Sequence, residues 1–248
     1  MISKETIKRL IGLQTKKLRQ KYNQFLVEGE KSIAELLKSE LEIVHIYHSK
    51  DLKILHEFDV FTNKNLFIEV DNEVIKKISI HQSTPTAIAL VNIPTNKLPE
   101  KLDKLVIGLD NIQDPGNLGT IIRIADWYGI DYIVCNKGCA DIFNPKCINS
   151  TMGSFARIKI IHDEIESISQ KYNIPIYSCD MDGTSIHSKS FFITKGIVVI
   201  GNEGHGVSDE IKRKSLGTIS IPSYGKAESL NAAISCAIII DNLTQNPH

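Results

Sequence analysis

The chain has 248 residues, and its 29 Lys and Arg balance 29 Asp and Glu, so the formal net charge at pH 7 is zero. Hydrophobic residues make up 42% and charged residues 23%, a globular composition that excludes collagen-like, mucin-like and wholly disordered chains. No apolar run approaches the roughly 18–20 residues of a membrane-spanning helix, so we expect no membrane partner.

The amino-terminal residues contain no apolar segment typical of a signal peptide, and the five Cys are scattered along the chain. This pattern favours a cytoplasmic protein with reduced thiols. The spacings between Cys135, Cys139 and Cys147 match no common zinc motif, so we expect no metal.

Residues 1–25 contain seven basic residues and one acidic residue, a local charge of +6. Apolar residues at helical spacing predict one amphipathic basic helix over about 4–21. Two interpretations stay open on charge alone. The lysines and arginines either neutralise phosphates of a nucleic acid or form an ordinary solvated helix face.

Strands and helices alternate through the first half of the chain, which favours an α/β layer structure. We predict strands at 25–28, 43–47, 66–70 and 87–93, and helices at 30–38, 51–57 and 71–79. Residues 94–103 (PTNKLPEKLD) contain two prolines and four charges and are typical of a linker. The predicted organisation is a domain of residues 1–95, a linker of 96–103 and a second domain of 104–248.

The second half alternates in the same way, and its nearly continuous apolar strands indicate a parallel sheet covered on both faces. We predict strands at 105–110, 132–135, 155–161, 175–179, 196–201 and 218–221, and helices at 117–128, 145–152, 163–172, 208–215 and 229–244. Three segments, 109–129, 197–208 and 219–241, place Gly, Asn and charged residues where strands end. Ligands bind at the carboxyl ends of strands in open parallel sheets, so these segments form the candidate site.

In the first segment Arg123 lies between Ile122 and Ile124 in an otherwise apolar helix. A buried, unpaired guanidinium is costly, which points to a functional or paired arginine. The alternatives are a side chain that extends to the surface or a salt bridge with Asp126.

The second segment is a buried strand followed by a loop with Gly201, Gly204 and Gly206. It matches neither a dinucleotide-binding fingerprint nor a P-loop. Glu203 in this loop has an alternative interpretation as a helix N-terminal carboxylate, and His205 as a solvent-exposed loop residue.

In the third segment Ser229 is a plausible N-cap of the last helix, with Asn231 just inside it. The apolar face of this helix indicates protein core or a dimer interface. Its residues are Leu230, Ile234, Ala237 and Ile238.

Together and in this order, the three segments resemble the motifs of the SpoU (TrmH-like) RNA ribose 2′-O-methyltransferases of the SPOUT superfamily, over about 105–244. Residues 145–155 (PKCINSTMGSF) are similar to a Ser-Gly-Ser stretch of that family. The first half is similar to the small ribosomal-protein-like α/β domain that binds substrate RNA in such enzymes.

The resemblance implies an S-adenosylmethionine-dependent methyltransferase that acts on a ribose 2′-hydroxyl in rRNA or tRNA. It also implies a parallel-sheet domain with a deep trefoil knot, and a homodimer. The implied cofactor-binding residues are Gly201, Ile221 and Leu230; the implied catalytic residues are Asn117, Arg123, Glu203, Ser229 and Asn231; the expected RNA-binding residues are Lys16, Lys17 and Arg19.

The resemblance leaves two roles for Arg123, activation of the hydroxyl or orientation of a phosphate. The pKa of arginine, above about 12, favours the phosphate.

The third segment departs from the family motif at Ala232 and Ala233, where the family often has Val-Ser. We expect this departure to alter packing only. Two other functions are alternatives to this one. One is an RNA-binding module of the same fold without catalysis, and the other is a nucleotide-dependent enzyme acting on small metabolites.

Overall fold

The computed structural model describes residues 2–52, 65–188 and 193–244. Its packing divides the chain into two compact units. Unit 1 comprises Met1–Thr95 and Asp141–Ala156, and unit 2 comprises Asn96–Ala140 and Arg157–His248. The domain limits given above stay a prediction, and they did not anticipate that 141–156 packs with the amino-terminal residues.

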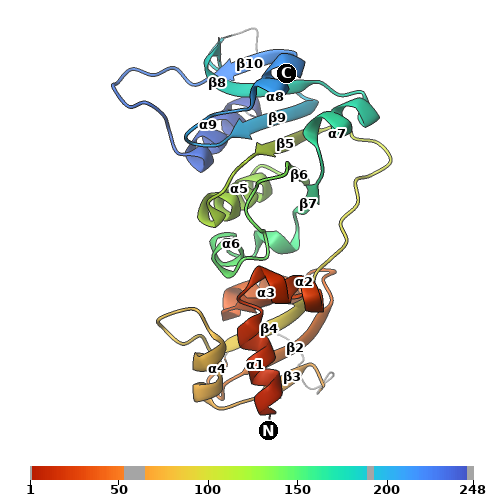
Figure 1. Cartoon of the computed structure of the whole chain (residues 1–248), viewed down its shortest axis with the longest axis vertical. Coiled ribbons are helices and arrows are strands. Elements are labelled where there is room, and N and C mark those ends of the chain that lie inside the picture. The colour runs from red at the N-terminus through yellow and green to blue at the C-terminus, as the bar shows by residue number, and fades with distance from the viewer. Residues whose placement is uncertain (1, 53–64, 189–192, 245–248) are drawn as a thin grey trace. The chain divides into compact units, whose positions relative to one another are not determined.

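Unit 1 contains a four-stranded sheet in the order β1–β4–β2–β3, in which β4 is antiparallel to both neighbours and β2 is parallel to β3 (Figure 1). The strands are β1 Gln24–Glu28, β2 Ile43–His48, β3 Phe67–Glu69 and β4 Ala87–Asn92. The helices are α1 Lys4–Gly12, α2 Lys16–Tyr22, α3 Glu30–Leu37, α4 Asn72–Ile78 and α6 Pro145–Ser150.

Alternation along β1 explains the layers of unit 1. Phe25 and Val27 are buried with residues of α3 and α6, whereas Leu26 is buried with residues of α1 and α4. Successive side chains of a strand point to opposite faces, so each face of the sheet carries its own apolar core.

The single helix predicted over 4–21 is wrong, because α1 ends at Gly12 and α2 begins at Lys16. Thr15 has extended backbone angles and separates the two helices. A Cβ on Gly12 would lie 2.4 Å from Leu18 Cδ1, so the absence of a side chain lets the two helices pack closely. Residues 53–57 of the helix predicted at 51–57 lie outside the described residues.

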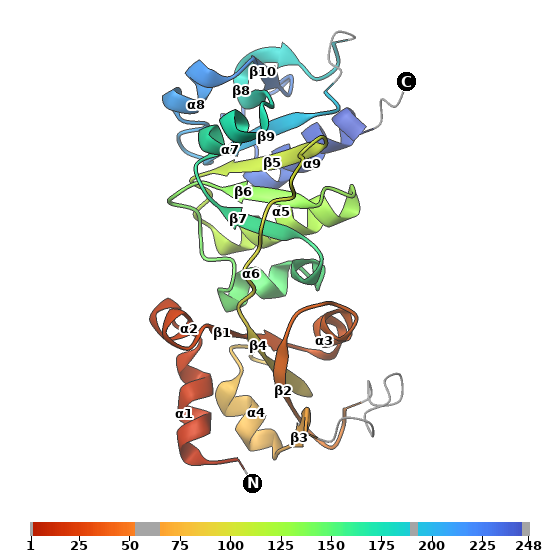
Figure 2. The ribbon, with the colours of Figure 1, turned by 90° about the vertical axis from the view of Figure 1, so that its right-hand side faces the viewer.

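Unit 2 contains a six-stranded parallel sheet in the order β10–β8–β9–β5–β6–β7, which confirms the predicted α/β class. The strands are β5 Leu105–Asp110, β6 Tyr132–Cys135, β7 Lys159–His162, β8 Ile176–Ser185, β9 Gly196–Gly201 and β10 Gly217–Ser220. The helices are α5 Pro115–Trp127, α7 Ile165–Tyr172, α8 Asp209–Lys214 and α9 Ala232–Thr244. In Figures 1 and 2, α5 and α9 cover one face of this sheet and α7 and α8 the other.

The strand predicted at 155–161 is shorter and later, because η3 (Ser154–Ala156) is a 3-10 turn and β7 starts at Lys159. The predicted strand began too early because it included the apolar residue Phe155. The ring of Phe155 instead packs edge-on against that of Phe25 in the core of unit 1, with 6.0 Å between the ring centroids. No helix among the described residues combines the length and apolarity needed to cross a bilayer.

Candidate active site

The candidate site lies at the carboxyl edge of the unit 2 sheet. β5 and β9 are parallel neighbours whose last residues, Asp110 and Gly201, are paired in register. β8 lies between β9 and β10. Because all these strands are parallel, the loops that follow β5, β9 and β10 leave the sheet at one edge. These loops carry the three segments that the sequence singled out.

A hydrogen-bonded network joins one residue from each segment. The Asn117 side-chain amide on α5 donates to Glu203 Oε1 in the loop after β9. Asn231, immediately before α9, donates from Nδ2 to Asn117 Oδ1 at 2.9 Å. Three of the five predicted catalytic residues are therefore joined through Asn117, although 114 positions separate Asn117 from Asn231.

Asn231 also fixes the start of α9. Its Oδ1 accepts hydrogen bonds from the backbone N–H of Ala233 at 3.0 Å and of Ile234 at 3.3 Å, which is the action of an N-cap. The prediction that Ser229 caps this helix is therefore wrong: α9 begins at Ala232, and Ser229 lies in the preceding loop. Ala232 and Ala233, which stand where the family often has Val-Ser, are both buried.

The loop after β9 folds back tightly on the end of its own strand. Asn202 and Gly206 form a two-way backbone bridge, with N–O distances of 3.1 and 2.8 Å. A Cβ on Gly201 would lie 2.1 Å from the carbonyl carbon of Gly206. Gly201 is thus required by the fold of its own loop, which is a different reason from the predicted close approach of a cofactor.

Two polar residues missed by the sequence analysis hold this loop in place. Asp110, buried at the end of β5, accepts a hydrogen bond from Ser208 N at 2.8 Å. Asn202 donates from Nδ2 to the carbonyl of Asn111 at 3.1 Å and accepts from Gly204 N at 2.8 Å. The pattern that could have identified them is an Asp or Asn directly at the end of an apolar strand.

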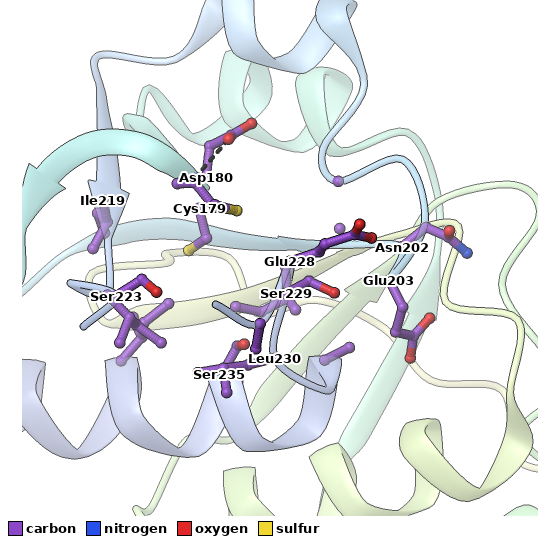
Figure 3. A pocket seen from close by; sticks show the side chains of 18 of the residues that line it. Cys179, Asp180, Asn202, Glu203, Ile219, Ser223, Glu228, Ser229, Leu230 and Ser235 are labelled. Atoms are coloured by element: carbon purple, nitrogen blue, oxygen red, sulfur yellow. Dashed lines mark hydrogen bonds between the residues drawn. The ribbon is translucent and has the colours of Figure 1, made fainter. Parts of the chain in front are cut away.

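A cavity of about 680 Å³ opens between strand β8, the loops after β9 and β10, and helix α9 (Figure 3). All three predicted cofactor-binding residues, Gly201, Ile221 and Leu230, line it, and so do Glu203 and Ser229. Its apolar wall also includes Ile200, Ile219 and Ile239. Neither Asn117 nor Arg123 is among the lining residues.

The charged groups of the cavity are mostly carboxylates. The lining contains three carboxylates, Asp180, Glu203 and Glu228, and one ammonium, that of Lys212, which gives a formal charge of one minus three, or −2. The hydrogen bond from Lys212 to Asp180 holds the pKa of that carboxyl below its usual value and raises the pKa of the lysine. His205, the histidine of the predicted loop, lines the cavity and is exposed.

Two thiols lie near the cavity. Cys179 lines it, and burial raises the pKa of its thiol; burial also raises the pKa of Cys236, on α9, to about 12. Both are therefore protonated at neutral pH and act as apolar groups rather than nucleophiles. The described residues contain no group of three His, Cys, Asp or Glu that could hold a metal, and the expected absence of a metal stays a prediction.

Arg123 is on α5, six residues after Asn117, and its side chain is exposed. It forms no hydrogen bond or ion pair with any residue that the structure describes. The alternative partner, Asp126, is instead bound by Arg157, with Nη2 2.7 Å from Oδ2. The guanidinium thus escapes the cost of burial by reaching solvent, where it is accessible to a ligand.

The three residues expected to bind RNA differ in exposure. Lys16 and Lys17 are exposed at the start of α2. Arg19 is 2% exposed and donates to Asp141 Oδ2 at 2.7 Å and to the carbonyls of Leu13 and Gln14. Its guanidinium is therefore used inside unit 1, and we withdraw it from the predicted phosphate-binding set.

Comparison with known proteins follows the same division of the chain. Residues 104–241 match the SpoU rRNA Methylase family, and residues 4–89 match the MRM3-like substrate binding domain. The chain is 32% identical over 235 residues to the 23S rRNA (guanosine(2553)-2'-O)-methyltransferase RlmP of Bacillus subtilis. That alignment covers 93% of this chain and 92% of that protein.

Solved structures show the same fold. A TrmH-family protein from Porphyromonas gingivalis is 29% identical, with a TM-score of 0.84 over 98% of both chains. The SpoU methyltransferase AviRb from Streptomyces viridochromogenes, solved with AdoMet, has a TM-score of 0.86 over 98% of both chains at 23% identity, a likeness of fold alone. The family match over more than half of the chain and the 32% identity to RlmP agree with the three motifs that meet at the sheet edge. This chain belongs to the SpoU rRNA methylase family.

Proposed function

We propose that this protein transfers the methyl group of S-adenosylmethionine to a ribose 2′-hydroxyl in large-subunit rRNA. The observation that carries the proposal is the Asn117–Glu203–Asn231 network beside a cavity of net negative charge. The RlmP relative supports an rRNA rather than a tRNA substrate. We include the expected cytoplasmic location in this proposal.

The cavity suits S-adenosylmethionine in size, wall and charge. A volume of about 680 Å³ lies within the range of roughly 300–1,000 Å³ that small-molecule sites occupy. The isoleucines of the wall offer an apolar surface to the adenine, and the excess of carboxylates suits a cationic sulfonium. Polyphosphate cofactors would meet repulsion there, which argues against the nucleotide-dependent alternative.

When bound, S-adenosylmethionine supplies an electrophilic methyl carbon on a positively charged sulfur. The part of this chain is to orient the two reactants, because in-line placement of hydroxyl and methyl carbon supplies much of the rate. Gly201, Ile221 and Leu230 would hold the cofactor, and Ser229 would offer a hydroxyl from the lining of the cavity. We assign the Asn117 network to orientation of the ribose and Arg123 to a phosphate beside it.

We also propose that the chain forms a homodimer through α5 and α9. Large apolar side chains are exposed on both helices: Trp127 is 82% exposed, Ile234 53% and Ile238 36%. Exposed apolar patches on paired helices are typical of protein interfaces. Gel filtration with light scattering should give twice the 27.7 kDa chain mass, and Ile234→Asp should shift it toward the monomer. A wild-type monomer at micromolar concentration would contradict the interface.

The trefoil knot expected from the resemblance belongs to this proposal as well. Three features support it: β9 is inserted between β5 and β8, the loop 201–207 folds back on itself, and α9 returns to pack on α5.

The proposed activity is tested with 23S rRNA transcribed in vitro, which carries no methyl groups. We expect the protein to transfer tritium from methyl-labelled S-adenosylmethionine to this RNA, and nuclease digestion to release a 2′-O-methylated nucleoside. A folded protein that binds the rRNA but leaves every ribose unmethylated would favour the alternative of a binding module. RNA carrying a 2′-deoxy residue at the mapped site is the matched control.

A further inference from the structure

The charges of the cavity are not equivalent, because most of them already have partners. Asp180 is paired with Lys212, and Glu203 accepts from Asn117. Glu228 also lines the cavity, yet it forms no hydrogen bond or ion pair with a residue in the described part of the chain. Its carboxylate is therefore a negative charge of the cavity that protein contacts leave uncompensated.

The close view shows how the three carboxylates differ in direction. Figure 3 places the carboxylate of Glu228 at the cavity, whereas that of Glu203 points away toward α5, where Asn117 lies. Asp180 points to the opposite side, toward its partner Lys212. Glu228 is exposed and lies in the loop between β10 and α9, next to the predicted site residues Ser229 and Leu230.

Cofactor and product of the proposed reaction differ by one charge at nearly constant shape. S-adenosylmethionine carries a sulfonium cation, and the loss of its methyl group leaves the neutral thioether of S-adenosylhomocysteine. Apolar walls and backbone hydrogen bonds recognise the parts that both molecules share. Only a group that senses charge can separate them strongly, and an uncompensated carboxylate in a cleft does so.

We propose that Glu228 is a specificity-determining residue that favours the charged cofactor over the neutral product. The inference rests on the proposed function and adds to it a means of product release: once the methyl group leaves, the attraction to Glu228 disappears. Because the carboxylate is exposed, water and salt screen it, so its effect is moderate and depends on ionic strength.

The test compares the dissociation constants of S-adenosylmethionine and S-adenosylhomocysteine by calorimetry on the full chain. For Glu228→Gln at low salt we expect S-adenosylmethionine to bind roughly 5- to 10-fold more weakly, and S-adenosylhomocysteine to change less than about 2-fold. Glu228→Asp keeps the charge and should retain most of the preference. Glu100→Gln removes an exposed carboxylate outside the cavity and should change neither constant.

Salt gives a second readout that does not require a variant. In wild type, 0.5 M NaCl should weaken S-adenosylmethionine more than S-adenosylhomocysteine, and in Glu228→Gln this difference should be much smaller. Unchanged affinities in Glu228→Gln, or equal losses for both ligands, would overturn the assignment of Glu228 and leave the proposed function standing. Failure of the wild-type protein to bind either ligand would instead contradict the proposed cofactor site itself.

Discussion

At the scale of single residues, one side chain of the site has two tasks. The Oδ1 of Asn231 caps α9, while its Nδ2 donates to Asn117. An amide can do both, whereas a carboxylate accepts but does not donate. The geometry of the network and the start of the helix are thus coupled through one residue.

Asn231→Asp should separate the two tasks. The carboxylate still caps α9, so we expect the free energy of unfolding to stay within about 0.5 kcal/mol of wild type. Methyl transfer should fall at least tenfold, because the bond donated to Asn117 is lost and a negative charge is added to the network. Asn231→Ala should lose activity and also about 1 kcal/mol of stability. Denaturant unfolding and the rRNA assay measure the two effects; equal stability losses in both variants would refute the capping role.

Arg123 should matter to chemistry more than to cofactor binding, because it is exposed on α5 and does not line the cavity. Arg123→Ala should leave S-adenosylmethionine affinity nearly unchanged and lower methyl transfer by orders of magnitude. Arg123→Lys should recover little, since an ammonium lacks the planar fork that grips phosphate.

The matched control for Arg123 is Arg213→Ala, which removes an exposed arginine of α8. It should retain wild-type turnover. Circular dichroism and gel filtration should accompany both variants. A folded Arg123→Ala enzyme of the same oligomeric state with near wild-type turnover would refute the catalytic assignment.

At the scale of elements, a close backbone approach and a few polar side-chain contacts hold loops and helices in place. The loop after β9 closes on Gly201, and Asp110 at the end of β5 holds its far end through Ser208. In unit 1, Arg19 performs a similar task, because it joins α2 to the segment that contains α6 through Asp141. In both arrangements, the residues in contact are far apart in the sequence.

Gly201→Ala should disturb this loop before any cofactor arrives, because the added Cβ meets the backbone of Gly206. We expect a loss of about 1–3 kcal/mol of stability together with weaker S-adenosylmethionine binding. The control is Gly225→Ala, in the loop before α9 that lines the same cavity, where an added Cβ meets nothing within 4 Å. Thermal unfolding that is unchanged in Gly201→Ala would contradict the tight closure.

Arg19→Ala should destabilise unit 1 rather than act only on RNA. It removes the arginine donor from Asp141 Oδ2 and from two backbone carbonyls. Loss of one partner of a buried pair costs about 3–5 kcal/mol. Denaturant unfolding should therefore show a large decrease in stability. A variant of wild-type stability that had lost only RNA affinity would restore Arg19 to the phosphate-binding set.

At the scale of the whole molecule, the basic residues proposed to meet RNA and the cavity proposed for the cofactor fall on different units. Unit 1 carries the basic residues of α1 and α2, while unit 2 carries the anionic cavity and the Asn117 network. The chain therefore has two regions of opposite local charge, although its formal net charge is zero. Each region suits a partner of the opposite charge, a phosphate backbone in one case and a sulfonium in the other.

The Lys16→Ala, Lys17→Ala double variant should weaken 23S rRNA binding and flatten its salt dependence. Two phosphate contacts contribute about 1.4 to the slope of log affinity against log salt concentration. S-adenosylmethionine affinity should not change. The control replaces Lys38 and Lys50, exposed lysines elsewhere in the same unit, with alanine. An identical slope in wild type and the double variant would leave Lys16 and Lys17 as a solvated face.

The sequence by itself determined the α/β class, the family resemblance and the edge of the sheet where the site lies. It could do so because apolar runs mark parallel strands, and parallel strands with helical crossovers bring their carboxyl ends to one edge. The polar residues after β5, β9 and β10 were therefore expected at one edge of the sheet, and the strand order then brought them into contact. Asn117, Glu203 and Asn231 are the clearest case.

Only the tertiary structure decided which atom meets which. It made Asn231 rather than Ser229 the cap of α9, buried Arg19 while leaving Lys16 exposed, and packed 141–156 into unit 1. Burial and hydrogen-bond pairing depend on residues distant in the chain, so a local pattern of charge and hydrophobicity cannot settle them. A lysine and an arginine three positions apart on one short helix look alike in sequence, and the fold gives them opposite surroundings.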